Sequence, residues 1–250
     1  MNNRLTILAR SGLCNKLRVL FTALYAAEKC KMQLSLAWLP VIGCRMEFGD
    51  YFKPINGVRI VSDERELIDD IFISTMTIAD NTDIMKYQNG CNLFLISCGA
   101  VTCGGTKNDI MVRHTRNRLI LKDDVADEIE SYASQYIDDK TIGFHIRATE
   151  HFLDIVPIEK YEQEISILPK NIKIYLATDK PGVYERLRDR FGNRIIYKEK
   201  TFGCDTKEGM RDGIIDLYLL NKCKMIYGVH TSSYSWMSSI IKNDVPLEIL

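Results

Sequence analysis

The sequence predicts an α/β protein of two domains, each built on a parallel sheet with helices on both faces. Three observations support this fold class. The chain has 250 residues, enough for two domains of ordinary size. Its first forty residues read as strand, tight loop, helix and strand, and the part after residue 140 alternates strands with helices at the spacing of βαβ units. Ligands of such sheets bind at the carboxyl ends of the strands, so candidate binding residues are expected there.

The N-terminal segment has the pattern of a βαβ unit. The apolar run RLTILAR predicts a strand over 4–10, and QLSLAW predicts another over 33–38. Between them lies a predicted helix whose apolar residues recur at helical spacing, namely Leu17, Leu20, Phe21 and Leu24.

The loop SGLCNK joins the first strand to this helix. Gly12 permits a backbone conformation that other residues avoid, and Asn15 could cap the helix. The loop is therefore either an ordinary βα turn or a ligand contact.

Residues 40–120 are less regular. NGVRIV and NLFLIS predict strands, whereas SDERELIDD predicts turns or short helices. Residues 122–138 predict an amphipathic helix that begins with acidic residues, as suits a helix N-terminus. We place the domain boundary just after it, near Asp139, which gives domains 1–139 and 140–250.

The second half predicts a regular alternation of strands and helices, in which Pro157 and Pro181 each begin a helix. The expected order is strand 141–147, helix 157–168, strand 172–177, helix 181–191, strand 194–198, helix 208–222, strand 224–229 and helix 234–242.

Composition excludes several classes of protein. Lys plus Arg and Asp plus Glu both number 33, so no global positive field favours nucleic acid. No apolar run is long enough to span a bilayer and no signal peptide is evident, so we expect a cytoplasmic protein. The eight cysteines are scattered and predict mostly buried thiols. Cys98 and Cys103 could meet across a turn, but a reducing cytosol disfavours a disulfide there.

The strand IGFHIRATE directs His145 and Arg147 to the same face. Arg147 falls at the carboxyl end, where a guanidinium can bind a phosphate through paired hydrogen bonds. The alternative is that Arg147 pairs with a surface carboxylate and that His145 is a core residue.

Two further stretches end at the same sheet edge. Asp179 follows a strand and precedes Pro181, so it either contacts a ligand or only orders the turn. In HTSSYSW, Ser232, Ser233 and Ser235 open a helix whose first N–H groups suit an anion, although serines are also common caps.

Asp212 and Asp216 lie four residues apart on one helix, where like charges oppose helix formation. Asp216 is also embedded in the apolar run IIDLYLL, so a ligand or a neighbouring side chain should donate hydrogen bonds to it. The adjacent N–H donors of a guanine base would satisfy both of its oxygens.

Together these motifs resemble the fucosyltransferase superfamily, which has a GT-B fold. SGLCNKLRVLFTALYAAEK is similar to the family's glycine loop and helix, and IGFHIRATE to its H-x-R-R-T-D motif. IYLATDKPGVYERLRDRFGNRII is similar to the A-T-D-D segment, and GMRDGIIDLYLLNKCKMIYGVHTSSYS to the D-x-x-x-L helix with its S-x-F-S turn. The similarity covers both ends and the whole second half, and residues 45–120 carry little of it.

The resemblance implies two Rossmann-like domains facing a central cleft. The N-terminal domain would carry the glycine loop and the acceptor side, and the C-terminal domain would bind a GDP-sugar. By the family's pattern Arg147 contacts the β-phosphate, and His145 and Asp216 lie toward the guanine. The remaining implied contacts are Asp179 on the nucleoside side, Ser232 and Ser233 at the diphosphate, and Gly12 with Asn15 from the first domain.

The implied reaction transfers fucose from GDP-fucose to a glycan hydroxyl with inversion. Arg147 would stabilise the departing diphosphate, and the general base would be Asp154 or, second, Glu150. The sequence contains no D-x-D triplet, so we expect no metal and no other cofactor. Ala148 replaces the family's second arginine, and Glu150 replaces its aspartate. The alternatives are another donor such as GDP-mannose, or a sugar-nucleotide-binding protein without catalysis.

Overall fold

The computed structural model describes residues 3–74, 76–78, 83–87, 92–148 and 156–250. The chain forms two compact units, and each is described by itself. The first contains Met1–Lys122 with Cys204–Lys207, and the second contains Asp123–Gly203 with Glu208–Leu250.

The units divide one helix earlier than the predicted boundary near Asp139. Helix α5 (Asp123–Tyr136) belongs to the second unit. The ring of Tyr132 lies 6.1 Å from that of Tyr175, and Glu128 forms ion pairs with Lys198 and Arg211. The amphipathic helix thus buries its apolar face against the second sheet, which sequence periodicity alone does not indicate.

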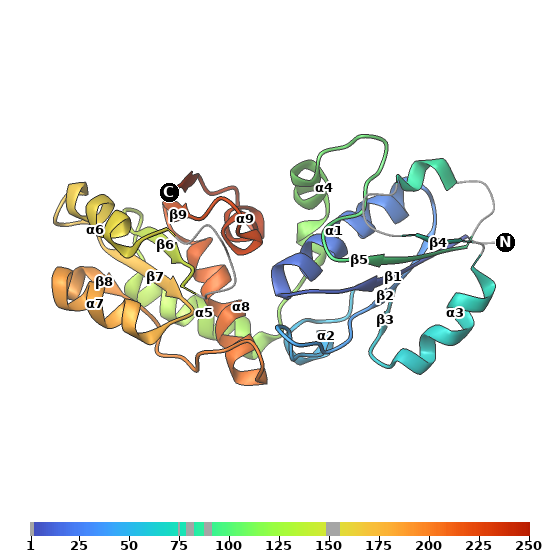
Figure 1. Ribbon diagram of the computed structural model, residues 1–250, viewed down its shortest axis with the longest axis horizontal. Helices are drawn as coiled ribbons and strands as arrows, with labels where there is room; N and C mark the ends of the chain where they lie inside the picture. The colour runs from blue at the N-terminus through green and yellow to red at the C-terminus, as the bar shows by residue number, and fades with distance from the viewer. Residues whose placement is uncertain (1–2, 75, 79–82, 88–91, 149–155) are drawn as a thin grey trace. The chain divides into compact units, whose positions relative to one another are not determined.

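The first unit has a parallel sheet in the order β3-β2-β1-β5-β4 (Figure 1). Its strands are β1 (Arg4–Ala9), β2 (Gln33–Ala37), β3 (Val58–Val61), β4 (Met76–Ile78) and β5 (Leu93–Ser97). Ile7 at its centre lies opposite Leu36 on one side and Leu95 on the other.

Helices cover both faces of this sheet. Helix α1 (Leu13–Lys29) packs with α4 (Asn108–Thr115) on one face, where the Thr115 hydroxyl donates to the Phe21 carbonyl at 3.0 Å. Helix α3 (Leu67–Ile73) lies on the other face (Figure 1), and its Leu67 packs in one cluster with Leu8 and Phe94. Helix α2 (Phe48–Tyr51) is a single turn.

The second unit has a parallel sheet in the order β10-β9-β6-β7-β8. Its strands are β6 (Ile142–Ile146), β7 (Ile174–Thr178), β8 (Ile195–Ile196), β9 (Met225–Gly228) and β10 (Leu247–Ile249). Helices α6 (Ile158–Ile167) and α7 (Pro181–Phe191) cover one face, where Phe144, Tyr161 and Leu187 share a buried cluster. Helices α5, α8 (Lys207–Leu220) and α9 (Ser233–Ile240) cover the other.

The predicted elements of the second half are confirmed within a few residues at each end. The helices and strands that the sequence did not predict are α2, α4, β4 and β10, of which the two strands are three-residue edge strands. Such short segments give no apolar alternation to detect. Short 3-10 helices occur at Glu64–Glu66, Ile84–Tyr87, Arg116–Arg118 and Gly192–Arg194.

The cysteine prediction is confirmed for the part of the chain that the structure describes. None of its seven cysteines forms a disulfide, Cys98 and Cys103 included, and five are buried. No described helix combines the length and the apolarity needed to cross a membrane.

Candidate functional site

The candidate site lies where the strand order of the second sheet reverses. From β6 the chain runs to β7 and β8 on one side, and then crosses to β9 and β10 on the other. Ligands of such sheets bind at this switch point, outside the carboxyl ends of the strands. Arg147 follows β6 there, and the turn that leads from β9 into α9 lies at the same edge.

His145 connects the elements at the switch point. Its side chain is buried, with 8% exposed, and its Nδ1 lies 2.7 Å from the Ser235 hydroxyl. That hydroxyl also accepts the Val229 N–H at 3.0 Å, and it can donate its own hydrogen to Nδ1 when the ring proton is on Nε2. The imidazole also stacks on Tyr234, with ring centroids 4.7 Å apart. His145 therefore ties β6 to α9, and Ser235 ties α9 to the residue that follows β9.

Burial lowers the pKa of His145 to about 4. The charge of Asp179 opposes this shift, whereas the charges of Arg147 and Lys200 add to it. The imidazole is therefore neutral at neutral pH, and it can serve as a hydrogen-bonding group but not as a cation.

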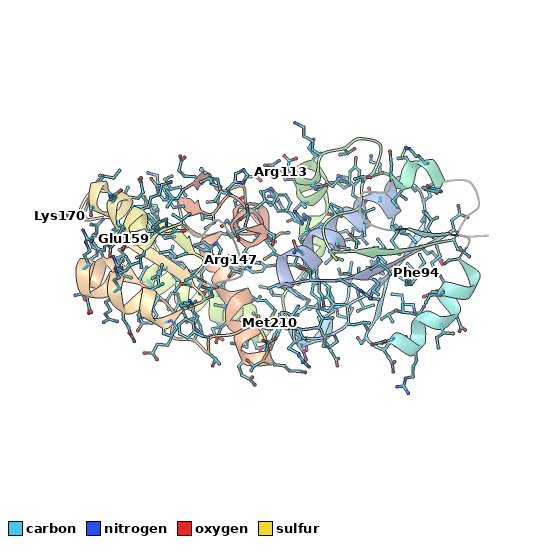
Figure 2. The ribbon with its side chains drawn as sticks, in the orientation of Figure 1. Phe94, Arg113, Arg147, Glu159, Lys170 and Met210 are labelled. Carbon is cyan, nitrogen blue, oxygen red and sulfur yellow. The ribbon has the colours of Figure 1, made fainter. Side chains whose placement is uncertain are left out.

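Asp179 fixes the backbone next to Arg147. Its carboxylate accepts the N–H of Ala148 at 2.8 Å, which ties the end of β7 to the residue after Arg147. Asp179 does not cap the next helix, because Lys180 is the N-cap of α7 and no side chain caps it. The observed contact orders the backbone at the turn, and contact of Asp179 with a ligand stays a prediction. Figure 2 shows the half-buried Arg147 where the chain leaves β6.

The serine turn begins α9. Ser232 is its N-cap, with a hydroxyl that accepts the Ser235 N–H at 3.4 Å, and Ser233 is the first helical residue. The capping role is thus confirmed for Ser232. The N–H groups of a first helical turn are a general binding site for anions, so contact of Ser232 and Ser233 with a diphosphate stays a prediction.

Asp216 is buried, with 4% exposed, and the protein itself satisfies its carboxylate. One oxygen accepts the Tyr175 hydroxyl at 2.5 Å, and the other forms an ion pair with Lys200. Of the two partners that the sequence allows for this carboxylate, the structure supplies the neighbouring side chains. A guanine base is therefore not needed to explain why Asp216 is buried.

Asp212, one turn earlier on α8, is compensated in the same way. It lies 3.5 Å from the Lys198 ammonium and accepts the Thr201 N–H at 2.7 Å. The segment Lys198–Thr201 thus supplies the positive charges that the aspartate pair requires.

Sequence reasoning missed Lys200, Tyr175 and Tyr234. Lys200 neutralises Asp216 and contributes to the field at His145, and Tyr234 forms the platform under the imidazole. The one available signal was the alternation of Lys198 and Lys200 shortly before a helix that carries two aspartates. Nothing in the sequence indicates that Tyr175 on β7 reaches α8.

The loop before α1 in the first unit corrects two expectations. Gly12 has an ordinary φ of −67°, and the left-handed conformation falls on Ser11, with φ of 76°. The N-cap of α1 is Gly12, so Asn15 lies in the first helical turn and does not cap it. Asn15 instead donates to the Ser11 hydroxyl at 2.9 Å and accepts from Arg18 at 3.0 Å. It holds the strained residue, and contact of Gly12 or Asn15 with a nucleotide stays a prediction.

Glu150 and Asp154, the predicted bases, lie outside the described residues. Their roles stay predictions. Among the residues that the structure does describe, no three His, Cys, Asp or Glu side chains are grouped so that they could hold a metal ion.

Two parallel sheets with helices on their faces define an α/β fold, and polar residues lie at the switch point of the second sheet. Over the full chain it is similar to NodZ α-1,6-fucosyltransferase soaked with GDP-fucose, with a TM-score of 0.69, 19% identity and 95% of that chain covered. A mutant of Arabidopsis thaliana FUT1 in complex with GDP has a TM-score of 0.64 at 13% identity, with 100% of this chain and 70% of that one covered. POFUT1 in complex with GDP gives 0.57 at 10% identity, with 100% and 98% covered.

These similarities confirm the predicted fold class, and at such low identity they carry the fold alone. No protein-family model and no curated protein sequence matches the chain.

Proposed function

We propose that the protein is a glycosyltransferase that transfers fucose from GDP-fucose to a hydroxyl of a glycan, with inversion and without a metal ion. One observation carries the proposal. His145 contacts α9 at the switch point of the second sheet, Arg147 follows the same strand there, and the fold is shared along the whole chain with fucosyltransferases whose structures contain GDP or were soaked with GDP-fucose.

Arg147 and α9 would act on the departing diphosphate. The guanidinium can form two charge-assisted hydrogen bonds to phosphate oxygens, and the first N–H groups of α9 present the positive end of the helix dipole. Both would stabilise the negative charge that develops on GDP as the glycosidic bond breaks. Because Ala148 stands where the family has a second arginine, Arg147 is the main cation for this task.

His145 and Asp179 would position the nucleoside. The neutral imidazole would offer its Nε2–H to an acceptor on the nucleotide, since its Nδ1 is occupied by Ser235. Asp216 would contact the guanine only if the nucleotide displaced Tyr175 or Lys200. We propose instead that Asp216 supports the base site indirectly, by holding Lys200.

The general base would take the proton of the acceptor hydroxyl as the new bond forms. Asp154 is the first candidate and Glu150 the second. Steady-state rates of Asp154→Asn and Glu150→Gln identify the base, and full turnover by both variants would exclude both residues.

Two alternatives follow from the same site. A different donor such as GDP-mannose would use the same nucleotide contacts. A binding protein without catalysis is favoured by Ala148, which removes a cation near the leaving group. Turnover of a donor panel distinguishes these two from a fucosyltransferase.

The decisive experiment is calorimetric titration with GDP, GDP-fucose, GDP-mannose and UDP-glucose, with and without EDTA. We expect EDTA-insensitive binding of GDP and GDP-fucose. Arg147→Ala should weaken GDP binding by roughly tenfold to a hundredfold, the usual loss for a charge-assisted hydrogen bond. Arg188→Ala on α7 is the matched control, because Arg188 packs over Tyr197 instead of at the switch point. Unchanged GDP affinity in Arg147→Ala would remove the central claim.

A further inference from the structure

The first unit contains a cavity of about 660 Å³ that the proposed donor chemistry does not use. It lies at the carboxyl ends of β1 and β5, on the face that α3 covers, and the segment 39–42 after β2 closes one side. The volume is in the usual range for a small-molecule site.

The walls of this cavity are almost entirely apolar. They are formed by Leu8, Leu39, Leu67, Ile71, Phe94 and Ile96, and Phe94 is labelled in Figure 2. Among the described residues that line it, the polar side chains are Arg10, Ser11 and Glu64. A sugar ring buried here would lose hydrogen bonds from water at most of its hydroxyls without replacement. The cavity therefore suits an apolar group and not a glycan.

Exposed isoleucines surround the same cavity. Ile42 and Ile71 line it with 83% and 47% exposed, and Ile68, one turn before Ile71 on α3, is 51% exposed. Single exposed apolar residues are ordinary, but a group around a cavity marks an interaction surface. A bound apolar chain would cover these side chains as it entered.

Two charged residues show which end of the occupant remains in water. Arg10 and Glu64 line the cavity and are both exposed. A guanidinium can donate to hydroxyl or phosphate oxygens, and a carboxylate can accept from hydroxyls, so the pair complements a polar head. Ser11 lines the cavity too and is the first residue of the loop SGLCNK, which the family resemblance assigns to the donor diphosphate. A head group at Arg10 would therefore lie beside that loop.

We propose that this cavity binds the apolar chain of the acceptor, and that the acceptor is a glycan attached to a lipid-type chain. This inference rests on the proposed function, since it names the acceptor class of the same transferase. The chain enters between Ile42 and Ile71, and the polar head stays at Arg10 and Glu64.

The test uses n-decyl β-D-glucopyranoside, methyl β-D-glucopyranoside and n-decyl phosphate, each below its micellar concentration, in calorimetric titrations of the full chain. The decyl compounds should bind and the methyl glycoside should not, because affinity rises roughly tenfold for every two buried methylenes. Tighter binding of the phosphate that is lost in Arg10→Ala would assign a phosphate-linked chain. Equal binding of both decyl compounds would assign a neutral one.

Variants locate the binding. Ile71→Asp should weaken decyl binding by tenfold or more, and Ile42→Ser should weaken it less, since it removes apolar area without adding charge. Ile110→Asp is the matched control, because Ile110 is 50% exposed on α4, on the opposite face of the sheet. Ile42 and Ile71 are both exposed, so the two variants should fold and should bind GDP like the wild type.

Three results would overturn the inference. The first is that the wild type binds neither decyl compound, and the second is that Ile71→Asp binds them as tightly as the wild type does. The third is a wild-type dimer that dissociates in Ile71→Asp, because a second copy of the chain would then be the occupant. If the wild type does not bind GDP, the proposed function is overturned instead, and the decyl titrations can still be interpreted by themselves.

Discussion

At the scale of single residues, His145 is the residue on which the candidate site depends. Ser235 fixes its ring at Nδ1, Tyr234 stacks on it, and burial keeps it uncharged. An imidazolium in the same place would lie beside Arg147 and Lys200 without a water shell. The protein should therefore become less stable where an unfolded chain would protonate this histidine.

We expect stability to fall as the pH falls from about 6.5 toward 4. The unfolded chain binds a proton at the ordinary pKa of histidine, whereas folding holds the pKa of His145 at about 4, so protons favour unfolding in this window. At about pH 5 the difference is about 2 kcal/mol.

Urea unfolding of the wild type and of His145→Asn, at about pH 7 and about pH 5, measures this loss of stability. The variant should lose about 2 kcal/mol less than the wild type on acidification. Equal losses in the two proteins would show that His145 titrates normally in the fold.

The pair of Asp216 and Lys200 gives a second prediction. Asp216→Asn leaves the Lys200 ammonium, on a side chain only 9% exposed, without this counter-charge, which should lower the free energy of unfolding by about 3 kcal/mol. Adding Lys200→Met to Asp216→Asn should recover part of this loss, because removing both charges costs less than removing one. Asp212→Asn is the control and should cost less, since Lys198 keeps its ion pair with Glu128.

The same variant separates two roles of Asp216. If Asp216→Asn is as stable as the wild type and mainly weakens its preference for guanine over adenine nucleotides, the carboxylate binds the base. Denaturation and a nucleotide titration on one preparation decide between these outcomes.

The residue-level interpretation succeeded where strand alternation and strand ends carry the information. His145 and Arg147 follow from the alternation of one strand, and Ser232 follows from the preference of serine for N-caps. Lys200 and Tyr175 could not be found this way, because their contacts with Asp216 join elements that only the fold brings together. Ser11 was missed because glycine, not serine, is the usual residue at a positive φ.

At the scale of elements, the close approach of β9 to α9 sets the geometry of the switch point. A Cβ on Gly228 would lie 2.6 Å from both the Cβ and the Oγ of Ser235. No rotamer of Ser235 relieves the first of these contacts. The glycine therefore allows Ser235 to reach His145.

Gly228→Ala should lower the free energy of unfolding by about 1–3 kcal/mol, the usual cost of overpacking. It should also weaken GDP binding, because Ser235 and the start of α9 must move away from His145. Gly213→Ala on α8 is the matched control: beyond the backbone of its own helix, its Cβ would meet no atom of the described residues within 4 Å. The change should stabilise the helix by up to about 1 kcal/mol. Equal stability of the two variants, measured by urea unfolding, would contradict the close approach.

The elements themselves were predictable to different degrees. The strands and helices of the second half can be predicted from the sequence, because buried parallel strands are short apolar runs between amphipathic helices. In the first unit, α4 has three buried residues in a mostly polar helix, and β4 pairs only at the sheet edge. Tertiary packing, not local pattern, determines such elements.

At the scale of the whole molecule, the two units exchange chain. The chain leaves the second unit at Gly203 and re-enters it at Glu208, while Cys204–Lys207 belongs to the first. Three hydrogen bonds hold this segment there: Arg45 N–H to the Cys204 carbonyl at 3.3 Å, Gly43 N–H to Asp205 at 3.0 Å, and the Tyr51 hydroxyl to the Lys207 carbonyl at 2.6 Å. An ion pair between Lys207 and Asp50 at 2.8 Å adds to them. A sequence boundary at one point cannot describe such an exchange.

The two tryptophans allow ligand binding to be assigned to one unit, because Trp38 lies in the first unit and Trp236 lies on α9 in the second. We expect GDP at about 100 times its Kd to raise the free energy of unfolding reported by Trp236 by about 2.7 kcal/mol. Urea unfolding of Trp38→Phe, followed by fluorescence with and without GDP, measures it. The reciprocal variant Trp236→Phe reports the first unit, whose transition should move less unless the units unfold as one. If GDP moves the Trp38 transition and leaves that of Trp236 unchanged, the nucleotide binds the first unit and the switch point of the second sheet is not its site.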